Sequence, residues 1–458
     1  MIIEQIYTGC LAQGAYYIES NGEAAIIDPL RDVDAYLERA ERNGATIKYI
    51  FETHFHADFV SGHLDLAKKT GARIVFGPLA DTHYEKYEAT DGEVLPLGNI
   101  EFKVLHTPGH TPESTTYLLL DETGKEHAIF TGDTLFIGDV GRPDLAQNGA
   151  RTKEDLAGML YDSLRSKIMQ LPDDVIVYPA HGAGSACGKK MSRETTDTLG
   201  NQKLNNYALR ADMTREEFIQ EVTEGILPPP QYFPKNARLN REGYGAVDEV
   251  MKRGARPLSA AEFEEIANRE NALIIDTRHQ DQFRQGFIPN SIFFGIDGSF
   301  APWVGALVRD LNKPILLVAE PGREAEATKR LARVGYDNTL GYLDGGIDSW
   351  TGELDTIKSI SAAGLYSQLD KNDPTDAVLD VRKPTEFEAG HLDDALNTPL
   401  DYMSEQMSKL DHDHTYHIHC RSGYRSMIFA SILKSRGFDR VVDVAGGWQA
   451  LEPLASSL

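Results

Sequence analysis

The sequence predicts an α/β protein built from three domains, and three observations support this prediction. The chain has 458 residues, more than one hydrophobic core usually serves. Up to about residue 190, apolar runs such as Ala24 to Asp28 and Ile47 to Phe51 alternate with turns rich in Gly and Asp, which indicates strands mixed with helices. The remainder contains an internal repeat, which indicates two further domains of one kind.

The expected boundaries follow from local signals. Thr214 to Glu217 is a capping-box signature that starts a helix, and the prolines after Leu227 stop it. From Pro228 to about Arg256 the chain is rich in Pro, Gly and Asn, so we expect an extended arm or linker that leaves the first domain. A second capping box, Ser259 to Glu262, opens the next domain. We therefore expect domains over residues 1–245, 257–356 and 360–458.

The internal repeat is the clearest architectural signal. Leu273 to Arg278 recurs as Ala377 to Arg382, and matching aromatic and glycine positions follow at the same offsets. Each copy then has an apolar strand, a helix that ends in Gly-aromatic-Asp, and a Gly-Gly pair beside a Trp. Strands that alternate with helices at this length predict two small α/β domains, each with a parallel sheet.

The charge and the cysteine content limit the class of protein. A formal net charge of −24 and a pI near 5.0 disfavour nucleic acid and anionic membranes as partners. The N-terminus lacks the pattern of a signal peptide, and no apolar stretch approaches the roughly 18 residues of a membrane span. Three cysteines, Cys10, Cys187 and Cys420, cannot form a disulfide framework. We expect a cytoplasmic location and a homo-oligomer.

A candidate metal site lies in the first domain. His54 and His56, followed by Asp58, come directly after a predicted strand, and two imidazoles one residue apart can point at a common centre when a turn releases the strand's alternation. Three more candidate ligands follow at the ends of later predicted strands: His110, Asp133 and His181. One such histidine is usually an ordinary hydrogen-bonded imidazole, but four of them with two aspartates indicate a metal centre.

This constellation resembles the metallo-β-lactamase superfamily over residues 1 to about 245. The resemblance implies an αββα sandwich with its metal at one edge. The superfamily's usual signature continues from the aspartate into another histidine that helps hold a second metal, whereas this chain has Phe59. Because an apolar ring cannot ligate a metal, a dinuclear hydrolytic site of the glyoxalase II-like type is disfavoured.

Two stretches, Asp133 to Phe136 and Gly141 to Asp144, resemble the persulfide dioxygenase branch more closely. That resemblance implies Fe(II), one per chain, with about three positions left open for O₂ and a substrate sulfur. The implied iron ligands are His54, His110 and Asp133. Zinc held by His54, His56 and His110 uses the same residues and remains the alternative.

Other residues would then support this metal. His56, Asp58 and His181 would orient the ligands or the substrate. Arg142 lies on a Gly-flanked turn after the Asp133 strand, where it either forms a structural ion pair or braces the loop or an anionic substrate. Cys187, six residues after His181, is either a core thiol or a relay for sulfane sulfur.

A reactive cysteine is predicted in the last domain. Cys420 lies between an apolar strand and a helix expected from Met427 to Lys434, so backbone N–H groups and a helix N-terminus favour its thiolate. Cysteine phosphatases keep five residues between Cys and Arg, but Cys420 and Arg425 enclose four, a tighter cup that suits a persulfide sulfur. Residues 360–458 resemble rhodanese sulfurtransferases, which implies catalytic roles for Cys420, Arg421 and Arg425.

The middle copy has no nucleophile. Its loop runs from Val318 to Arg323 without a cysteine, although Arg323 matches Arg425 in position. We therefore expect an inactive rhodanese-like domain with a role in packing or spacing.

Taken together, the resemblances imply a sulfide-detoxifying enzyme. Iron would oxidise a low-molecular-weight thiol persulfide with O₂ to sulfite, and Cys420 would transfer sulfane sulfur to sulfite to give thiosulfate. The first alternative is a zinc-dependent, glyoxalase II-like thioester hydrolase with an appended sulfurtransferase. The second is a sulfur carrier in which the metal is structural.

Overall fold

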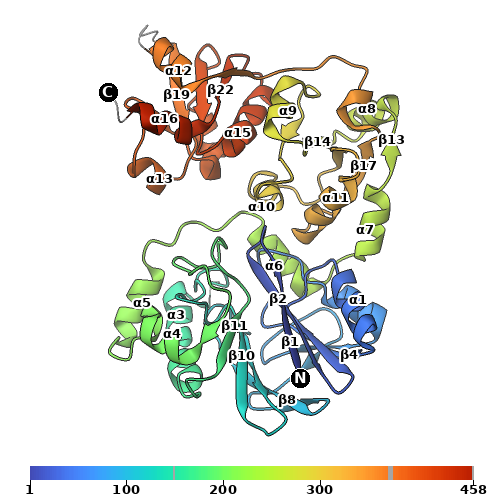
Figure 1. Ribbon diagram of the computed structural model, residues 1–458, viewed down its shortest axis with the longest axis vertical. Helices are drawn as coiled ribbons and strands as arrows, with labels where there is room; N and C mark the ends of the chain where they lie inside the picture. Colours follow the sequence, from blue (N-terminus) through green and yellow to red (C-terminus); the bar gives the residue numbers. More distant parts are fainter. Residues whose placement is uncertain (148–149, 370–374, 456–458) are drawn as a thin grey trace. The chain divides into compact units, whose positions relative to one another are not determined.

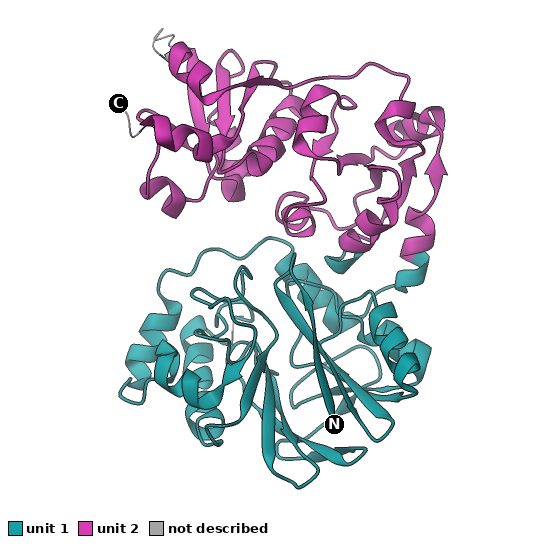
Figure 2. Cartoon of the chain, viewed as in Figure 1, with its two compact units in different colours: residues 1–249, 332–335 teal, residues 250–331, 336–458 magenta. Residues whose placement is uncertain are grey.

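The computed structural model describes residues 1–147, 150–369 and 375–455 (Figure 1). The chain divides into two compact units (Figure 2). The first contains residues 1–249 and 332–335, and the second contains residues 250–331 and 336–458. This division leaves the three predicted domain boundaries as predictions, and the last domain includes residues 370–374 and 456–458, which lie outside the described residues.

Two six-stranded sheets form the centre of the first unit. The first sheet follows chain order, and its strands are β1 (Ile2–Thr8), β2 (Gln13–Ser20), β3 (Glu23–Ile27), β4 (Thr46–Phe51), β5 (Arg73–Phe76) and β6 (Tyr87–Glu88). The second sheet has the order β12-β11-β10-β9-β8-β7, with β7 (Val94–Leu97), β8 (Ile100–His106), β9 (Thr115–Leu120), β10 (Glu126–Gly132), β11 (Ile176–Pro179) and β12 (Asp197–Thr198). Buried side chains of both sheets, among them Tyr16, Phe51, Phe102 and Phe130, form one core between them.

Helices cover both outer faces. On the first sheet they are α1 (Asp34–Asn43) and α2 (His63–Thr70), which contribute Tyr36 and Leu66 to an outer core. On the second sheet they are α3 (Lys153–Ser163), the π-helical turn η1 (Leu164–Ile168), α4 (Leu199–Asn205), the 3₁₀ turn η2 (Tyr207–Leu209) and α5 (Arg215–Thr223). This arrangement confirms the predicted αββα sandwich.

The expected extended arm is wrong, because the segment after Pro230 is largely helical. It contains α6 (Phe233–Glu242) and α7 (Val247–Gly254). Pro234 lies in the first turn of α6, where a proline costs no hydrogen bond. Phe233, Asn236 and Asn240 are buried along this helix, so packing against the first unit outweighs the weak helix propensity of the sequence.

The second unit contains two five-stranded parallel sheets with the same strand order. The first is β13-β17-β16-β14-β15, from β13 (Pro257–Leu258), β14 (Leu273–Asp276), β15 (Ile292–Phe293), β16 (Ile315–Val318) and β17 (Thr339–Leu343). The second is β18-β22-β21-β19-β20, from β18 (Lys358–Ile360), β19 (Asp376–Asp380), β20 (Leu396–Asn397), β21 (Thr415–His419) and β22 (Val441–Val444). The shared topology confirms the internal repeat.

Helices flank these sheets in matching places. The first copy has α8 (Ala260–Arg269), α9 (Gln280–Gln285), α10 (Phe300–Leu307), α11 (Glu324–Arg333) and the 3₁₀ turn η3 (Gly346–Ser349). The second has α12 (Ala362–Leu369), α13 (Pro384–Glu388), the 3₁₀ turn η4 (Leu400–Tyr402), α14 (Met403–Met407), α15 (Tyr424–Ser435) and α16 (Gly447–Ala455). Both predicted capping boxes form, at the starts of α5 and α8. Among the described residues, no helix is long and apolar enough to cross a membrane.

Candidate metal centre and sulfur-transfer loop

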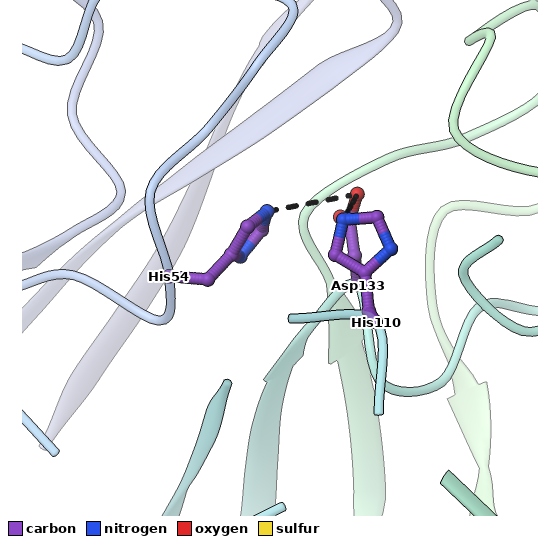
Figure 3. A group of neighbouring side chains, drawn as sticks. All are labelled: His54, His110 and Asp133. Carbon is purple, nitrogen blue, oxygen red and sulfur yellow. Dashed lines mark ion pairs between the residues drawn. The ribbon is translucent and has the colours of Figure 1, made fainter. Parts of the chain in front are cut away.

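Three buried side chains from separate strand ends meet in the first unit. His54 follows β4, His110 follows β8, and Asp133 comes directly after β10. The Nε2 atoms of His54 and His110 lie 3.8 Å and 3.4 Å from Oδ2 of Asp133 (Figure 3). All three residues are at most 2% exposed. The structure therefore brings together the three residues that the sequence predicts as ligands.

Hydrogen bonds fix both imidazoles with Nε2 free to ligate. Nδ1 of His110 donates to the carbonyl oxygen of Arg142 at 2.8 Å. Nδ1 of His54 donates to the Thr53 hydroxyl at 2.9 Å, and this hydroxyl in turn donates to Asp28 at 2.9 Å. Burial, followed by the neighbouring His56, lowers the pKa of His54 well below its usual range. His54 is therefore neutral, and in each ring the Nε2 lone pair faces Asp133.

Asp133 presents an unpaired oxygen to this centre. Its Oδ1 accepts a hydrogen bond from His181 at 2.8 Å, whereas Oδ2 is buried without a hydrogen-bond partner in the described structure. Burial opposes ionisation of Asp133, but the charge of His181 and its hydrogen bond outweigh burial and lower the pKa of Asp133. A buried carboxylate oxygen that faces two imidazole lone pairs fits a bound cation, and two nitrogens with one oxygen form a facial donor set.

His181 links two carboxylates behind the candidate ligands. It donates to Asp133 through Nδ1 and to Asp58 through Nε2, each at 2.8 Å. Burial lowers the pKa of His181, but Asp133 and Asp58 outweigh this effect and raise it well above the usual range. The predicted supporting residues Asp58 and His181 thus form one ion-paired chain that orients Asp133.

His56 belongs to two other groups of possible ligand atoms, one with Asp58 and His181 and one with Asp28 and Glu52. Its Nε2 lies 3.1 Å from Oδ1 of Asp28 and 3.9 Å from Glu52, and its ring stacks on Phe59 with the ring centroids 4.3 Å apart. Burial, then the charge of Asp28, raises the pKa of Glu52 well above its usual range. Within the described residues, no cluster of candidate ligand atoms contains His54, His56 and His110 together.

Arg142 bonds to protein groups through its side chain and its backbone. Its guanidinium group bonds both carboxylate oxygens of Asp144, at 2.7 and 2.8 Å, and the carbonyl oxygen of Leu227 at 2.6 Å. Its backbone connects the candidate ligand His110 to the chain around Cys187, because its N–H donates to the Cys187 carbonyl at 2.9 Å. The side-chain partners are therefore protein groups.

Cys187 lies beside the candidate metal ligands. Its thiol is buried, and its sulfur lies within 4.8 Å of ligand atoms of both Asp133 and His181. Burial, then the charges of Asp58 and Asp133, raises the pKa of this thiol well above its usual range. Cys187 is therefore a neutral thiol next to the centre.

The last domain forms the predicted cysteine loop between β21 and α15. Cys420 is buried, and its sulfur accepts a hydrogen bond from the N–H of Gly423 at 3.2 Å. Gly423 has a φ of 108°, a left-handed backbone conformation that favours glycine. From the other side, the N–H of Trp448 donates to the Cys420 carbonyl at 2.7 Å. The loop thus closes as a cup around the sulfur.

The two arginines of this loop differ. Arg425 forms a two-pronged ion pair with Glu386, at 2.6 and 2.8 Å. That hydrogen bond lowers the pKa of Glu386 to about 2. Arg421 is exposed. The exposed charge of Arg421 suits an incoming anion, whereas Arg425 is paired with Glu386 of α13.

The middle domain has the same frame with an alanine at the reactive position. A Cβ atom on Gly346 would approach the Ala319 carbonyl oxygen, and one on Gly447 would approach the Cys420 carbonyl oxygen in the same way. Ala319 is thus the counterpart of Cys420. Arg323 pairs with Asp297 and Glu326 instead of facing a thiol.

Two residues that support the metal centre were missed from the sequence. Asp28 ends an apolar run as Asp133 does, and this strand-end position was an available signal. Asn240 in α6 donates to the carbonyl oxygens of His56 and Phe59, at 2.7 and 2.8 Å, and accepts from Ser61 N–H at 2.9 Å. Its place in a Pro- and Asn-rich segment gave no such signal.

Family comparisons define the class of protein. The model of the metallo-beta-lactamase superfamily matches residues 8–181, and the model of the rhodanese-like domain matches residues 259–353 and 361–452. The chain is thus an enzyme of the metallo-β-lactamase fold joined to two rhodanese-like domains.

Individual relatives narrow the family. The human mitochondrial persulfide dioxygenase ETHE1 is 33% identical over 221 residues, which are 46% of this chain and 74% of that protein. The crystal structure of a metallo-β-lactamase from Staphylococcus aureus is 32% identical with a TM-score of 0.66, covering 75% of this chain and 98% of that one. A β-lactamase hydrolase-like protein from Agrobacterium fabrum is 30% identical over 51% of this chain and 58% of its own length. The chain belongs to the persulfide dioxygenase family of the metallo-β-lactamase superfamily.

Proposed function

We propose that the chain oxidises a low-molecular-weight thiol persulfide with O₂ to sulfite, and that Cys420 transfers sulfane sulfur to sulfite to give thiosulfate. The oxidation balances as RSSH + O₂ + H₂O giving RSH, sulfite and two protons. The proposal assigns the oxidation to residues 1–245 and the transfer to residues 360–458, separated by an inactive rhodanese-like domain at residues 257–356.

The observation that carries the proposal is the unpaired Oδ2 of Asp133, which faces Nε2 of His54 and of His110. Two histidines and one carboxylate are the donor set of mononuclear non-haem iron oxygenases. One Fe(II) held there would supply activation of O₂ beside a bound sulfur. Zinc remains the alternative metal, but its tetrahedral three-histidine set would need His56, which shares no group of possible ligand atoms with His54 and His110 among the described residues.

A single metal is favoured over a pair. The second-site histidine of the superfamily is replaced by Phe59, which is fully buried and stacks on His56. Asp58 and His181, which with His56 form a neighbouring group of possible ligand atoms, hydrogen-bond each other at 2.8 Å. A hydrolytic, glyoxalase II-like reaction that depends on two metals is therefore disfavoured.

The chain's own residues supply orientation and proton control. His181 and Asp58 hold Asp133, and the Arg142 carbonyl holds His110. Cys187 is a neutral thiol within reach of Asp133, so we assign it a role in receiving or aligning the substrate sulfur. Three free cysteines suit a reducing compartment such as the cytoplasm.

The proposed sulfur transfer takes place at the cysteine loop. The Cys420 thiolate attacks the outer sulfur of RSSH, the S–S bond breaks, and RS⁻ leaves as Cys420–S–SH forms. The sulfur of sulfite then attacks this outer sulfur, which regenerates the Cys420 thiolate and releases thiosulfate with the proton. Arg421 lies exposed beside the loop, where its charge favours approach of the sulfite dianion.

Oxygen uptake tests the proposal most simply. Iron-loaded protein, given glutathione persulfide or another small thiol persulfide in an oxygen electrode, should consume about one O₂ per sulfite formed, as the balanced reaction requires. Hydrolysis of a glutathione thioester without oxygen uptake would favour the hydrolase instead. Neither activity, with Cys420 still loaded by persulfide, would favour the sulfur carrier.

A further inference from the structure

The cysteine-free domain touches the loop that carries Cys420, within the second unit. Tyr424 follows Gly423 and begins α15. Its hydroxyl leaves its own domain and donates to the carbonyl oxygen of Gly295 at 2.7 Å. Its ring also lies edge-on against Phe293, with the ring centroids 5.5 Å apart. Both partners belong to the middle domain, so a residue of the active loop is anchored by the inactive copy.

The middle domain leaves room for this ring. A Cβ atom on Gly298 would overlap the Tyr424 ring, and one on Gly295 would lie 3.1 Å from it. Neither glycine has the positive φ that requires glycine for conformational reasons. The ring of Tyr424 therefore occupies the space that a side chain at position 298 would need.

A second bond ties the same helix to the same strand. Ser431, two turns further along α15, accepts a hydrogen bond from the N–H of Phe293 at 3.0 Å, and Ser431 is fully buried. Lys434 pairs with Asp355 at 3.0 Å. Helix α15 begins directly after the cup around Cys420. It is therefore fixed to the middle domain at both ends.

The inactive loop has no counterpart of Tyr424. In the middle copy Arg323 follows Gly322 directly, whereas Tyr424 stands between Gly423 and Arg425. The active loop thus contains one additional residue, and this residue is the one that reaches the neighbouring domain.

We propose that Tyr424 is a positioning residue for sulfur transfer, and that the cysteine-free domain serves the reaction by anchoring it. The anchor fixes Gly423, whose N–H is the hydrogen-bond donor to the Cys420 sulfur. That bond stabilises the thiolate that forms when sulfite removes the outer sulfur, so loss of the anchor slows turnover more than it weakens binding. The inference rests on the proposed function, specifically on transfer through Cys420.

The test uses full-length protein under anaerobic conditions, so that no oxygen chemistry contributes, with thiosulfate formed from glutathione persulfide and sulfite as the readout. Tyr424→Phe removes only the bond to Gly295 and should lower kcat about 3- to 10-fold with KM nearly unchanged. Tyr424→Ala should lower kcat about 100-fold, the size of effect that a displaced reacting group produces. The matched control is Tyr366→Phe in α12, because the Tyr366 hydroxyl is buried without a partner in the described structure. It should retain full activity.

A substitution in the inactive domain makes the test independent of Tyr424 itself. Gly298→Ala should reproduce the loss of kcat, and Gly298→Ala with Tyr424→Ala should be no slower than Tyr424→Ala alone, because the clash requires the ring. Unchanged kcat in a folded Gly298→Ala protein, or losses that multiply in the double variant, would overturn the positioning role. If wild-type protein makes no thiosulfate through Cys420, the proposed transfer function fails instead, and the two failures are distinct.

Discussion

The metal centre and the sulfur-transfer loop are assembled in opposite ways. His54, His110 and Asp133 come from three strand ends far apart in the sequence, and their support extends to Asn240 in α6. Cys420 and Arg425 lie in one short stretch of sequence, Cys420 in the loop after β21 and Arg425 in the first turn of α15. A centre drawn from distant segments depends on the packing of its whole domain, whereas a loop centre depends on local bonds and on whatever holds the loop. The two sites can therefore be impaired independently of each other.

The largest expected effect comes from removing a candidate metal ligand. His110→Ala should reduce persulfide-dependent oxygen uptake by more than about 100-fold, because one of three ligands is lost. Sulfur transfer at Cys420 should continue, since that loop belongs to another domain. The matched control is His106→Ala, which loses an imidazole bonded to the Pro112 carbonyl at 2.9 Å, away from the ligand set. Equal loss of both activities in folded His110→Ala protein would contradict the separation.

The converse change is Cys420→Ser, which should turn a thiosulfate producer into a sulfite producer. Serine keeps the loop's shape but cannot form a persulfide, and Ala319 of the middle copy offers no replacement thiol. Oxygen uptake should survive. Product analysis after persulfide addition measures this, with uncatalysed exchange subtracted and Cys10→Ser as the cysteine control. Undiminished enzymatic thiosulfate would move the transfer step elsewhere, with Cys187 as the next candidate.

The support of the metal centre predicts a stability effect. Asn240→Ala leaves the carbonyl groups of His56 and Phe59 and the N–H of Ser61 buried without their partner. We expect a loss of about 3 to 5 kcal/mol in unfolding free energy, with weaker metal binding. Asn236→Ala on the same helix is the control, because its buried amide has no hydrogen bond in the described structure. Equal losses in both variants, measured by urea unfolding, would refute the role of the Asn240 bonds.

The smallest expected effect concerns the stability of the last domain and depends on pH. Asp443 in β22 is buried and accepts a hydrogen bond from Ser426 at 3.2 Å, and burial raises its pKa from 3.8 to about 6. A folded-state pKa above the unfolded value means that stability is full below the unfolded pKa and declines as pH rises through the folded pKa. Asp443→Asn removes this ionisation. Its gain in unfolding free energy should grow from roughly 1–2 kcal/mol at pH 5 to at most about 3 kcal/mol above pH 7.

Urea unfolding at several pH values measures this gain. Asp439→Asn, which changes an exposed carboxyl nearby, should give no comparable pH-dependent gain. A gain for Asp443→Asn that stays constant with pH would mean that ionisation of this carboxyl is not its cause.

The contrast between the metal centre and the sulfur-transfer loop also explains which features the sequence could predict. The cysteine loop was predictable because its strand, cysteine, glycine and arginine lie within one short stretch of sequence, and the repeat could be read from matching offsets. The three candidate metal ligands were predictable only through their positions at strand ends combined with a family resemblance. The direction of His56 was not, because it depends on Asp28 and Glu52, which meet it only after folding. Helix α6 could not be predicted from the sequence either, because packing rather than helix propensity stabilises it.

The contact between Tyr424 and Gly295 lay beyond the sequence for the same reason. The sequence around Tyr424 does not indicate which neighbouring domain its hydroxyl contacts. The missing side chain at Gly298 can be interpreted only when the Tyr424 ring is seen beside it. Residues that act through a neighbour are the ones that pattern alone does not reveal.

The metal content of active protein tests the central claim most directly. Protein purified without oxygen and loaded with Fe(II) should hold one iron per chain together with persulfide-dependent oxygen uptake, because His54, His110 and Asp133 form one facial set. Asp133→Ala should lose the iron, whereas His56→Ala should keep it at the same stoichiometry when iron is in excess, since His56 faces Asp28. Two tightly held zinc ions per active chain, with no gain in oxygen uptake on loading iron, would contradict the account.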